Sequence, residues 1–286
     1  LLASRQGNSS QNSELPDISP QGLATQDQQW RTYRHALKAY SKENLSDDAF
    51  ISLLMQQYRL ENYISQYHFR AYLVPINSEY GFHGAMASLP NLSVFKTVED
   101  YHAYLSRLNA LTPYFEQQIA YMRQGLKEGY TQPKVVLKGF EDAVAAYIMD
   151  DPVKSGFYSP FTRFPKHIDA SQQAALAQLG QKAITTSVFP AYQAFYDFMV
   201  DEYIPGARAA IAANEWPDGK AYYANRAKHY TTTDMSPEDI HTLGLKEVKR
   251  IRAEMQSVVD SLEFDGSINE FITFLREDPQ FYASSA

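Results

Sequence analysis

The chain has 286 residues, with 26 Lys plus Arg against 33 Asp plus Glu, which gives a formal net charge of −7 at pH 7. This acidic balance argues against broad binding to nucleic-acid phosphates, because such binding needs clustered basic side chains. The chain contains no cysteine, which excludes disulfides, thiol nucleophiles, Cys-ligated zinc and iron–sulfur clusters. No apolar run approaches the roughly 18 residues that a membrane-spanning helix needs, so we expect no transmembrane segment.

Residues 1–22 are rich in Ser, Gln, Asn and Pro and show no hydrophobic period. Their apolar content is too low to offset the entropy cost of ordering a chain, so the sequence predicts a disordered polar leader over residues 1–22. The first residue is Leu1. The sequence does not begin with a charged segment followed by an apolar stretch, so an intact signal peptide is not expected. A polar leader before a folded body is typical of exported bacterial proteins. We therefore expect a periplasmic protein or a lipoprotein whose anchor was lost with the true N-terminus; a cytoplasmic location is the alternative.

Residues 23–286 show helical periodicity almost throughout. Thr97 begins a capping box, followed by an apolar stripe at alternating steps of three and four up to Leu126, with a kink or break expected near Thr112 because Pro113 lacks an N–H. A second start is Ser236, with Pro237 in the first turn, and a stripe from there reaches Leu262. Further helices are expected over residues 30–40, 46–73, 133–149, 171–187, 191–203, 219–230 and 268–276.

This pattern predicts an all-α fold, an irregular multi-helix bundle. The few β-friendly runs are short and are better explained as helix ends. No repeat of 34 or 40 residues is present, so a regular tetratricopeptide or HEAT array is not expected. Pro190 and Pro205 are expected to bound the helix over 191–203.

The titratable residues form no self-contained catalytic or metal-binding motif. No two of the seven histidines lie three or four positions apart, so the His-Glu-x-x-His arrangement of zinc peptidases is absent from the sequence. Glu238 and His241 make a single Glu-x-x-His pair, which a helix cap explains, and Glu61 and His68 share one face of a predicted helix. The sequence therefore predicts no catalytic residue, metal ligand or cofactor within this chain.

Aromatic residues are abundant, with 21 Tyr, 16 Phe and 2 Trp. Because Tyr combines an apolar ring with a hydroxyl, Tyr clusters suit both the edge of a core and a binding cleft. Aromatic stretches stand out over residues 75–83, 157–165 (where prolines argue against regular structure) and 222–233. They either seal loops over the core or bind substrate; on the second interpretation the candidate substrate-binding residues are Asn77, His83, Arg163, Tyr222, Tyr223 and His229.

Several segments resemble the N-terminal half of the bacterial domain-of-unknown-function 885 family. They are residues 99–109, 202–208, 218–223 and, most clearly, 231–251. The resemblance covers about residues 30–286 and is dense along that stretch.

The resemblance implies a mostly helical protein about twice this length, whose C-terminal half carries a His-Glu-x-x-Pro-Gly-His-type segment similar to zinc-dependent metallopeptidases. This chain stops at Ala286 before any such segment. What the resemblance implies for residues 23–286 is therefore the N-terminal half of a larger helical, cleft-containing domain, with zinc expected only in the missing half.

We therefore expect the chain to form one wall of a substrate cleft in a zinc-dependent peptidase-like protein and to be inactive alone, with a peptide as substrate. The alternative is a non-enzymatic helical module that binds peptides or a cell-envelope partner. A cytosolic helical scaffold is a third interpretation. If the first is correct, we expect a contiguous exposed apolar patch of more than a few hundred Å².

Overall fold

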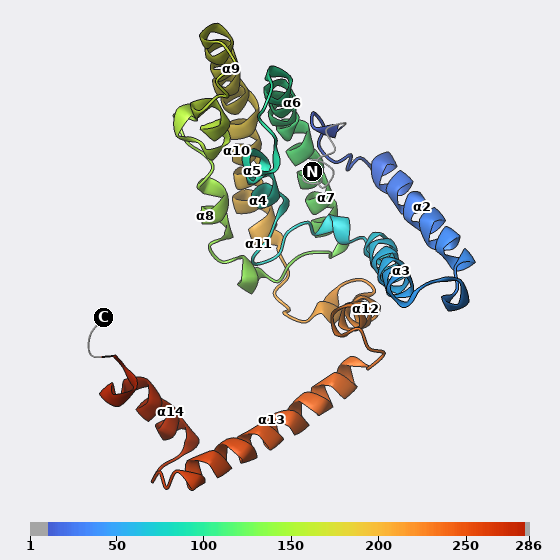
Figure 1. Ribbon diagram of the computed structural model, residues 1–286, viewed down its shortest axis with the longest axis vertical. Coiled ribbons are helices and arrows are strands. Elements are labelled where there is room, and N and C mark those ends of the chain that lie inside the picture. Colours follow the sequence, from blue (N-terminus) through green and yellow to red (C-terminus); the bar gives the residue numbers. More distant parts are fainter. Residues whose placement is uncertain (1–10, 284–286) are drawn as a thin grey trace. The chain divides into compact units, whose positions relative to one another are not determined.

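The computed structural model describes residues 11–283 of the chain (Figure 1). Within these residues the structure consists of helices and connecting turns, with no β-strand and two isolated bridges, Ile76 to Gly81 and Pro133 to Arg208. The all-α fold that the periodicity predicts is thus confirmed.

The chain divides into two compact units, one up to Tyr222 and one from Tyr223 onward. In the first unit α2 packs against α3, α6 against α9, and α10 against α7 and α8 (Figure 1). Its α-helices are α2 (Pro20–Ala36), α3 (Asp47–His68), α4 (Phe82–Ala87), α5 (Leu89–Leu92), α6 (Val98–Asn109), α7 (Leu111–Glu128), α8 (Phe140–Ala145), α9 (Ala170–Ala183), α10 (Phe189–Phe198) and α11 (Ile204–Gly206). The boundary falls in α12 (Gly219–Thr231), and the second unit contains α13 (Pro237–Ser261) and α14 (Ile268–Glu277).

The helix starts marked by capping residues lie where the sequence predicts them. The side chains of Thr97 and Ser236 each accept the backbone N–H of the third helical residue. The Asp side chain at that third position in turn accepts the backbone N–H of the capping residue. α6 ends at Asn109 and α7 begins at Leu111, which confirms the expected break near Thr112.

The expected disordered leader is wrong for residues 11–22. α2 begins at Pro20, with the Ser19 hydroxyl accepting the Gly22 N–H at 3.0 Å, and so starts well before the helix predicted over 30–40. The prediction relied on the low apolar content of this segment. The helix nevertheless begins here, because Ser19 caps it, Pro20 occupies its first turn, and packing against α3 stabilises it. Residues 1–10 lie outside the described residues.

Residues 11–18 are held by side chains of the helices beneath them. The buried Arg107 donates from Nε to the Glu14 carbonyl at 3.0 Å and from Nη2 to the Gln11 carbonyl at 2.9 Å. The Tyr121 hydroxyl donates to the Ile18 carbonyl at 2.7 Å. Because buried donors must be satisfied, these bonds fix the path of a segment that has no regular structure of its own.

The break expected at Pro190 is also absent. Helical structure continues from α9 through a π-helical segment at Ile184–Val188, α10, a second π-helical segment at Met199–Tyr203 and α11. The wider π turns accommodate residues that would interrupt an α-helix. Within the first of these segments the Thr186 hydroxyl donates to the Lys182 carbonyl at 2.8 Å, a side-chain bond to the preceding turn of the kind that Ser and Thr make in helices.

The helix predicted over 133–149 is broken. A short 3-10 helix at Lys134–Leu137 and α8 are separated by Gly139, whose φ of +77° is a conformation that glycine adopts readily and that interrupts helical hydrogen bonding. The Pro-rich stretch over 157–165, by contrast, is regular, because Gly156–Thr162 forms a 3-10 helix. Phe157, Tyr158 and Phe161 are buried in the core.

Much of the tyrosine content belongs to the core of the first unit. Tyr104 is fully buried and donates its hydroxyl to the Phe157 carbonyl at 2.9 Å, and Tyr203 accepts the Gln132 N–H at 3.2 Å. Burial raises the pKa of Tyr203 to about 12. The hydroxyls that would suit a binding cleft are therefore used to satisfy backbone groups inside the protein.

His83 lies in an aromatic part of this core. It is 7% exposed, and its ring centroid is 5.1 Å from Phe140 and 5.5 Å from Phe195. Its Nδ1 has no hydrogen-bond partner among the described residues, and a Cβ on Gly81 would lie 2.5 Å from that atom. Burial lowers the pKa of His83 to about 4, because the charged form would lose its hydration here.

We expect His83 to make the fold sensitive to acid. Its pKa is about 4 in the folded chain against the ordinary value of 6.5, so the unfolded chain binds the proton more readily. The stabilisation is complete above pH 6.5 and is lost as the pH falls towards 4, which amounts to about 3 kcal/mol at most. Chemical denaturation of His83→Leu between these pH values should show a shallower decline than the parent chain.

The matched control is His167→Leu, because His167 is exposed. It should leave the pH dependence of the unfolding free energy as it is. An equally steep decline in the parent chain and in His83→Leu would show that His83 is not the acid-sensitive group.

Candidate functional site

The four candidate substrate-binding residues of the first unit, Asn77, His83, Arg163 and Tyr222, do not lie together in one site. Asn77 and His83 flank one tight turn. The Asn77 N–H donates to the Tyr80 carbonyl at 2.8 Å, while the Asn77 Oδ1 accepts the N–H groups of Glu79 and Tyr80 at 2.8 and 2.7 Å. This arrangement gives Asn77 a local role in the turn, and His83 faces the core described above.

Arg163 and Tyr222 lie elsewhere in the first unit. Arg163 is exposed, and its backbone carbonyl accepts the Tyr101 hydroxyl at 3.4 Å. Tyr222 stacks on Trp216 with ring centroids 4.9 Å apart and meets the edge of Phe69 at 5.6 Å. Tyr222 thus packs in a small aromatic cluster.

Tyr223 and His229 belong to the second unit. Tyr223 is 51% exposed. Burial lowers the pKa of His229, with a further contribution from the neighbouring Arg226 charge, and its ring meets Tyr230 at 5.1 Å. A role of either residue in substrate binding stays a prediction.

A better-formed site, which the sequence did not indicate, lies where α2, α3 and the 3-10 turn Ala71–Leu73 meet in the first unit. It is an apolar pocket of about 120 Å³. Four aromatic side chains and two amides take part in its lining, which is formed by Leu23, Gln26, Trp30, Tyr63, Gln66, Tyr67, Ala71 and Tyr72. We call it the aromatic pocket.

The walls of the aromatic pocket are fixed by ring–ring contacts. Trp30 stacks on Tyr63 across the two helices, with ring centroids 5.0 Å apart. Tyr67 lies 5.8 Å from Tyr72, which in turn meets the edge of Tyr121 at 5.1 Å. Such contacts add to the stabilisation from buried area, so the pocket is formed before any ligand arrives.

Two arginines support these walls from outside. The Arg59 Nε donates to the Tyr63 hydroxyl at 2.8 Å, and the Arg59 guanidinium lies 5.5 Å from the centre of the Tyr63 ring. Arg70 binds the Glu128 carboxylate, which raises the pKa of Arg70, and also interacts with the Tyr72 hydroxyl. Both tyrosines are therefore held by their hydroxyls, and Tyr63 also by the cation over its ring.

Arg70 also makes the bend that closes the aromatic pocket. It has a φ of +55°, a left-handed conformation that is uncommon for residues other than glycine. This residue ends the helical direction of α3 and starts the turn Ala71–Leu73, which brings Ala71 and Tyr72 against the end of α2. Strained backbone of this kind is concentrated at functional sites.

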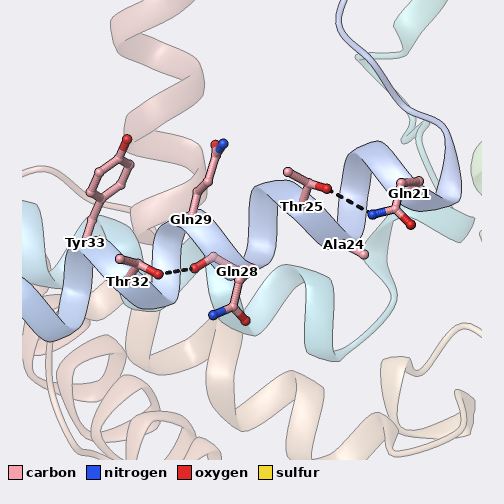
Figure 2. A pocket seen from close by; sticks show the side chains of 7 residues that line it. All are labelled: Gln21, Ala24, Thr25, Gln28, Gln29, Thr32 and Tyr33. Atoms are coloured by element: carbon pink, nitrogen blue, oxygen red, sulfur yellow. Dashed lines mark hydrogen bonds between the residues drawn. The ribbon is translucent and has the colours of Figure 1, made fainter.

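Figure 2 shows a second hollow, on the polar side of α2, lined by Gln21, Ala24, Thr25, Gln28, Gln29, Thr32 and Tyr33. The Gln21 amide donates to the Thr25 hydroxyl at 3.3 Å, and the Thr32 hydroxyl donates to the Gln28 carbonyl at 2.9 Å (Figure 2). Because all seven residues come from one helix, this hollow is a shallow surface rather than an enclosed site. Ligand sites are usually concave and mostly apolar, which favours the aromatic pocket.

The sequence contained only a partial signal for the aromatic pocket. Tyr63 and Tyr67 are one helical turn apart, so they share a face of α3. Trp30 and Tyr72 lie on other elements, and their approach depends on the pairing of α2 with α3 and on the bend at Arg70. Neither of those features follows from local periodicity.

The second unit carries an exposed apolar row along α13. Its members are spaced alternately by three and four positions and are between 37% and 59% exposed: Val248, Ile251, Met255, Val258 and Leu262, the residue that caps the helix. Val259, on a neighbouring face, is buried, and Phe264 meets the Phe271 ring of α14 at 5.1 Å. The contacts within this unit thus leave the row uncovered.

No group of three or more His, Asp or Glu side chains among residues 11–283 is arranged to hold a metal ion. The residues of the described chain therefore do not by themselves fit a zinc site. None of the described helices is both long enough and apolar enough to span a membrane.

The crystal structure of the putative lipoprotein from Colwellia psychrerythraea is similar to this fold, with a TM-score of 0.80 and 18% sequence identity. The similarity covers 99% of this chain and 52% of that one, so the chain spans about half the length of this solved relative. At such identity the similarity shows the fold alone. The comparison with curated proteins found no match to this chain.

The model of the family described as "Bacterial protein of unknown function (DUF885)" matches residues 1–286. The match therefore extends further towards the N-terminus than residues 30–286, over which the sequence motifs indicated the resemblance. It includes the leader segment, part of which packs on α6 and α7. The chain belongs to the DUF885 family of bacterial proteins.

Proposed function

We propose that this chain forms one wall of a substrate cleft in a zinc-dependent peptidase-like protein, with the zinc held by residues outside residues 1–286. The resemblance of the sequence motifs supports the reaction class. The length of the solved relative, of which this chain covers 52%, supports a second body. The chain's own part in the reaction is to bind and orient a peptide.

The exposed apolar row of α13 carries the part of this proposal that adds a second body. Its alternating spacing of three and four is the pattern of a helix that packs against another helix, with each side chain filling a hole on the partner. The row comprises five large apolar residues that their own unit does not bury. A helical body supplied by the remainder of a longer polypeptide is the occupant that we propose.

We expect a charge in the row to destabilise the longer polypeptide far more than this chain. Val258→Glu would bury an unpaired carboxylate in the complete gene product, which should lower the unfolding free energy by about 3 kcal/mol. In the 286-residue chain the same side chain stays in water, and the change should be within about 0.5 kcal/mol. Urea denaturation of both proteins measures the two values.

Ala253→Glu is the matched control on the same helix, because Ala253 is exposed and does not belong to the row. It should have little effect in either protein. Equal effects of Val258→Glu in the two proteins would show that nothing covers the row.

The zinc proposal has its own experiment. Metal content and cleavage of a mixed peptide library are measured for the complete gene product and for the 286-residue chain. We expect zinc and cleavage in the complete product and neither in the shorter chain, because the described residues assemble no set of metal ligands. Cleavage by the shorter chain alone, or a complete product without zinc or peptidase activity, would contradict the proposal.

The aromatic pocket favours one alternative, a non-enzymatic module that binds peptides or an envelope partner. A pocket lined by Trp30 and three tyrosines can hold a ligand without any chemistry. A complete gene product that binds peptides, contains no zinc and cleaves nothing would support this alternative.

We also propose that the protein acts outside the cytoplasm, as a periplasmic protein or as a lipoprotein. The solved protein with a similar fold is described as a putative lipoprotein, which supports this location. Cell fractionation of the native organism distinguishes it from a cytoplasmic scaffold.

A further inference from the structure

We propose that the aromatic pocket binds the ring of a proline residue in an extended peptide. This inference names the ligand of the chain's own binding surface. It rests on the part of the proposed function that makes this chain a peptide-binding wall, and not on zinc or cleavage.

The size of the pocket limits what can enter. Its volume is about 120 Å³, whereas an apolar cavity of about 150 Å³ is known to take benzene. The pocket is smaller than that cavity, which favours a group smaller than the ring of a Phe, Tyr or Trp side chain. The five-membered ring of proline and the side chains of Val or Leu remain within the limit.

The chemistry of the walls favours proline among these. Aromatic-lined grooves recognise proline-rich segments, because flat rings cover the flat pyrrolidine ring and because the extended proline helix loses little entropy on binding. Trp30, Tyr63, Tyr67 and Tyr72 provide four such rings around one small volume. Arg59 holds Tyr63 and Arg70 holds Tyr72. Trp30 and Tyr67 are positioned by their ring contacts with these two tyrosines, so binding does not have to order the walls.

The charges around the pocket argue against a cation. Aromatic cages for ammonium groups attract the positive charge through the ring faces. Here the Arg59 guanidinium already lies 5.5 Å from the Tyr63 ring centre, and no Asp or Glu is among the eight lining residues. A Lys side chain would meet a like charge without a carboxylate to balance it.

The rim of the pocket offers the polar contact that a prolyl peptide needs. A proline residue has no N–H, so the backbone around it presents carbonyl acceptors in excess. Gln26 lines the pocket from the exposed side of α2, and its amide is a donor of the right kind for such a carbonyl. The remaining lining surface is almost entirely apolar, as expected for a site that binds the ring of a proline residue.

The experiment measures binding of four blocked hexapeptides to the 286-residue chain by isothermal titration calorimetry. They are Ala-Ala-Pro-Pro-Ala-Ala and the versions with Leu, Phe or Lys in place of both prolines. Trp30 is one of only two tryptophans in the chain, so its fluorescence reports independently whether the ligand reaches this pocket. We expect saturable binding of the Pro peptide with a change in tryptophan emission, and binding weaker by about tenfold for the other three.

Two variants test the site from opposite directions. Tyr67→Ala removes a wall and should weaken binding of the Pro peptide by about tenfold, whereas Tyr67→Phe keeps the ring and should stay within about twofold. Ala71→Leu fills the pocket, so it should abolish binding and raise the melting temperature together. That combination separates a blocked pocket from a protein that fails to fold.

Tyr33→Ala is the matched control, because Tyr33 is an exposed tyrosine of α2 that does not line the pocket. It should bind the Pro peptide like the parent chain. Absence of binding, equal binding of the Leu or Phe peptide, stronger binding of the Lys peptide, or unchanged binding by Ala71→Leu would each overturn the inference. Because this readout involves neither zinc nor cleavage, its failure leaves the zinc experiment to be judged separately.

Discussion

The structure depends on one constraint, which is that every helix must cover the apolar side that its sequence presents. The first unit meets this constraint with aromatic side chains. The ring centroid of Phe115 on α7 lies 4.8 Å from that of Tyr192 and 6.1 Å from that of Phe195, both on α10. The ring centroid of Phe82 lies 4.9 Å from that of Phe115. One network of rings thus joins helices that are far apart in sequence. Burial of such rings is the main source of stabilisation in this unit. The row on α13 is the place where its own unit does not meet the same constraint.

The aromatic pocket follows from the same use of aromatic rings. Where α2 lies on α3, the contact is made by large flat side chains that cannot fill a curved space completely, and a small apolar volume remains between Trp30, Tyr63, Tyr67 and Tyr72. The arginines beside it hold the tyrosine hydroxyls in place. Gaps of this kind are uncommon, because protein interiors are close-packed and contain few voids. The ring contacts of Trp30 and Tyr67 and the hydroxyl interactions of Tyr63 and Tyr72 keep this pocket open, and this is why we assign it to a ligand.

The sequence predicted the all-α fold and the helix starts at Thr97 and Ser236, because capping and periodicity are local properties. It did not predict the order of residues 11–22, since that order comes from Arg107 and Tyr121 on distant helices. The sequence also predicted a helix boundary at Pro190, whereas the structure continues as a helix through two π-helical segments. The candidate residues lie in stretches rich in aromatic side chains, and in the structure His83 and Tyr222 pack against other rings. The aromatic pocket needed the pairing of α2 with α3, which no local pattern contains.

The first unit completes its own core, whereas we propose that α13 packs against a further body. Amide hydrogen exchange measures this directly, because protection follows the free energy of local opening. In the 286-residue chain we expect slow exchange in α7 and much faster exchange in α13, and in the complete gene product we expect slow exchange in both. Protection of α13 as strong as that of α7 in the 286-residue chain would contradict the account, as would fast exchange of α13 in both proteins.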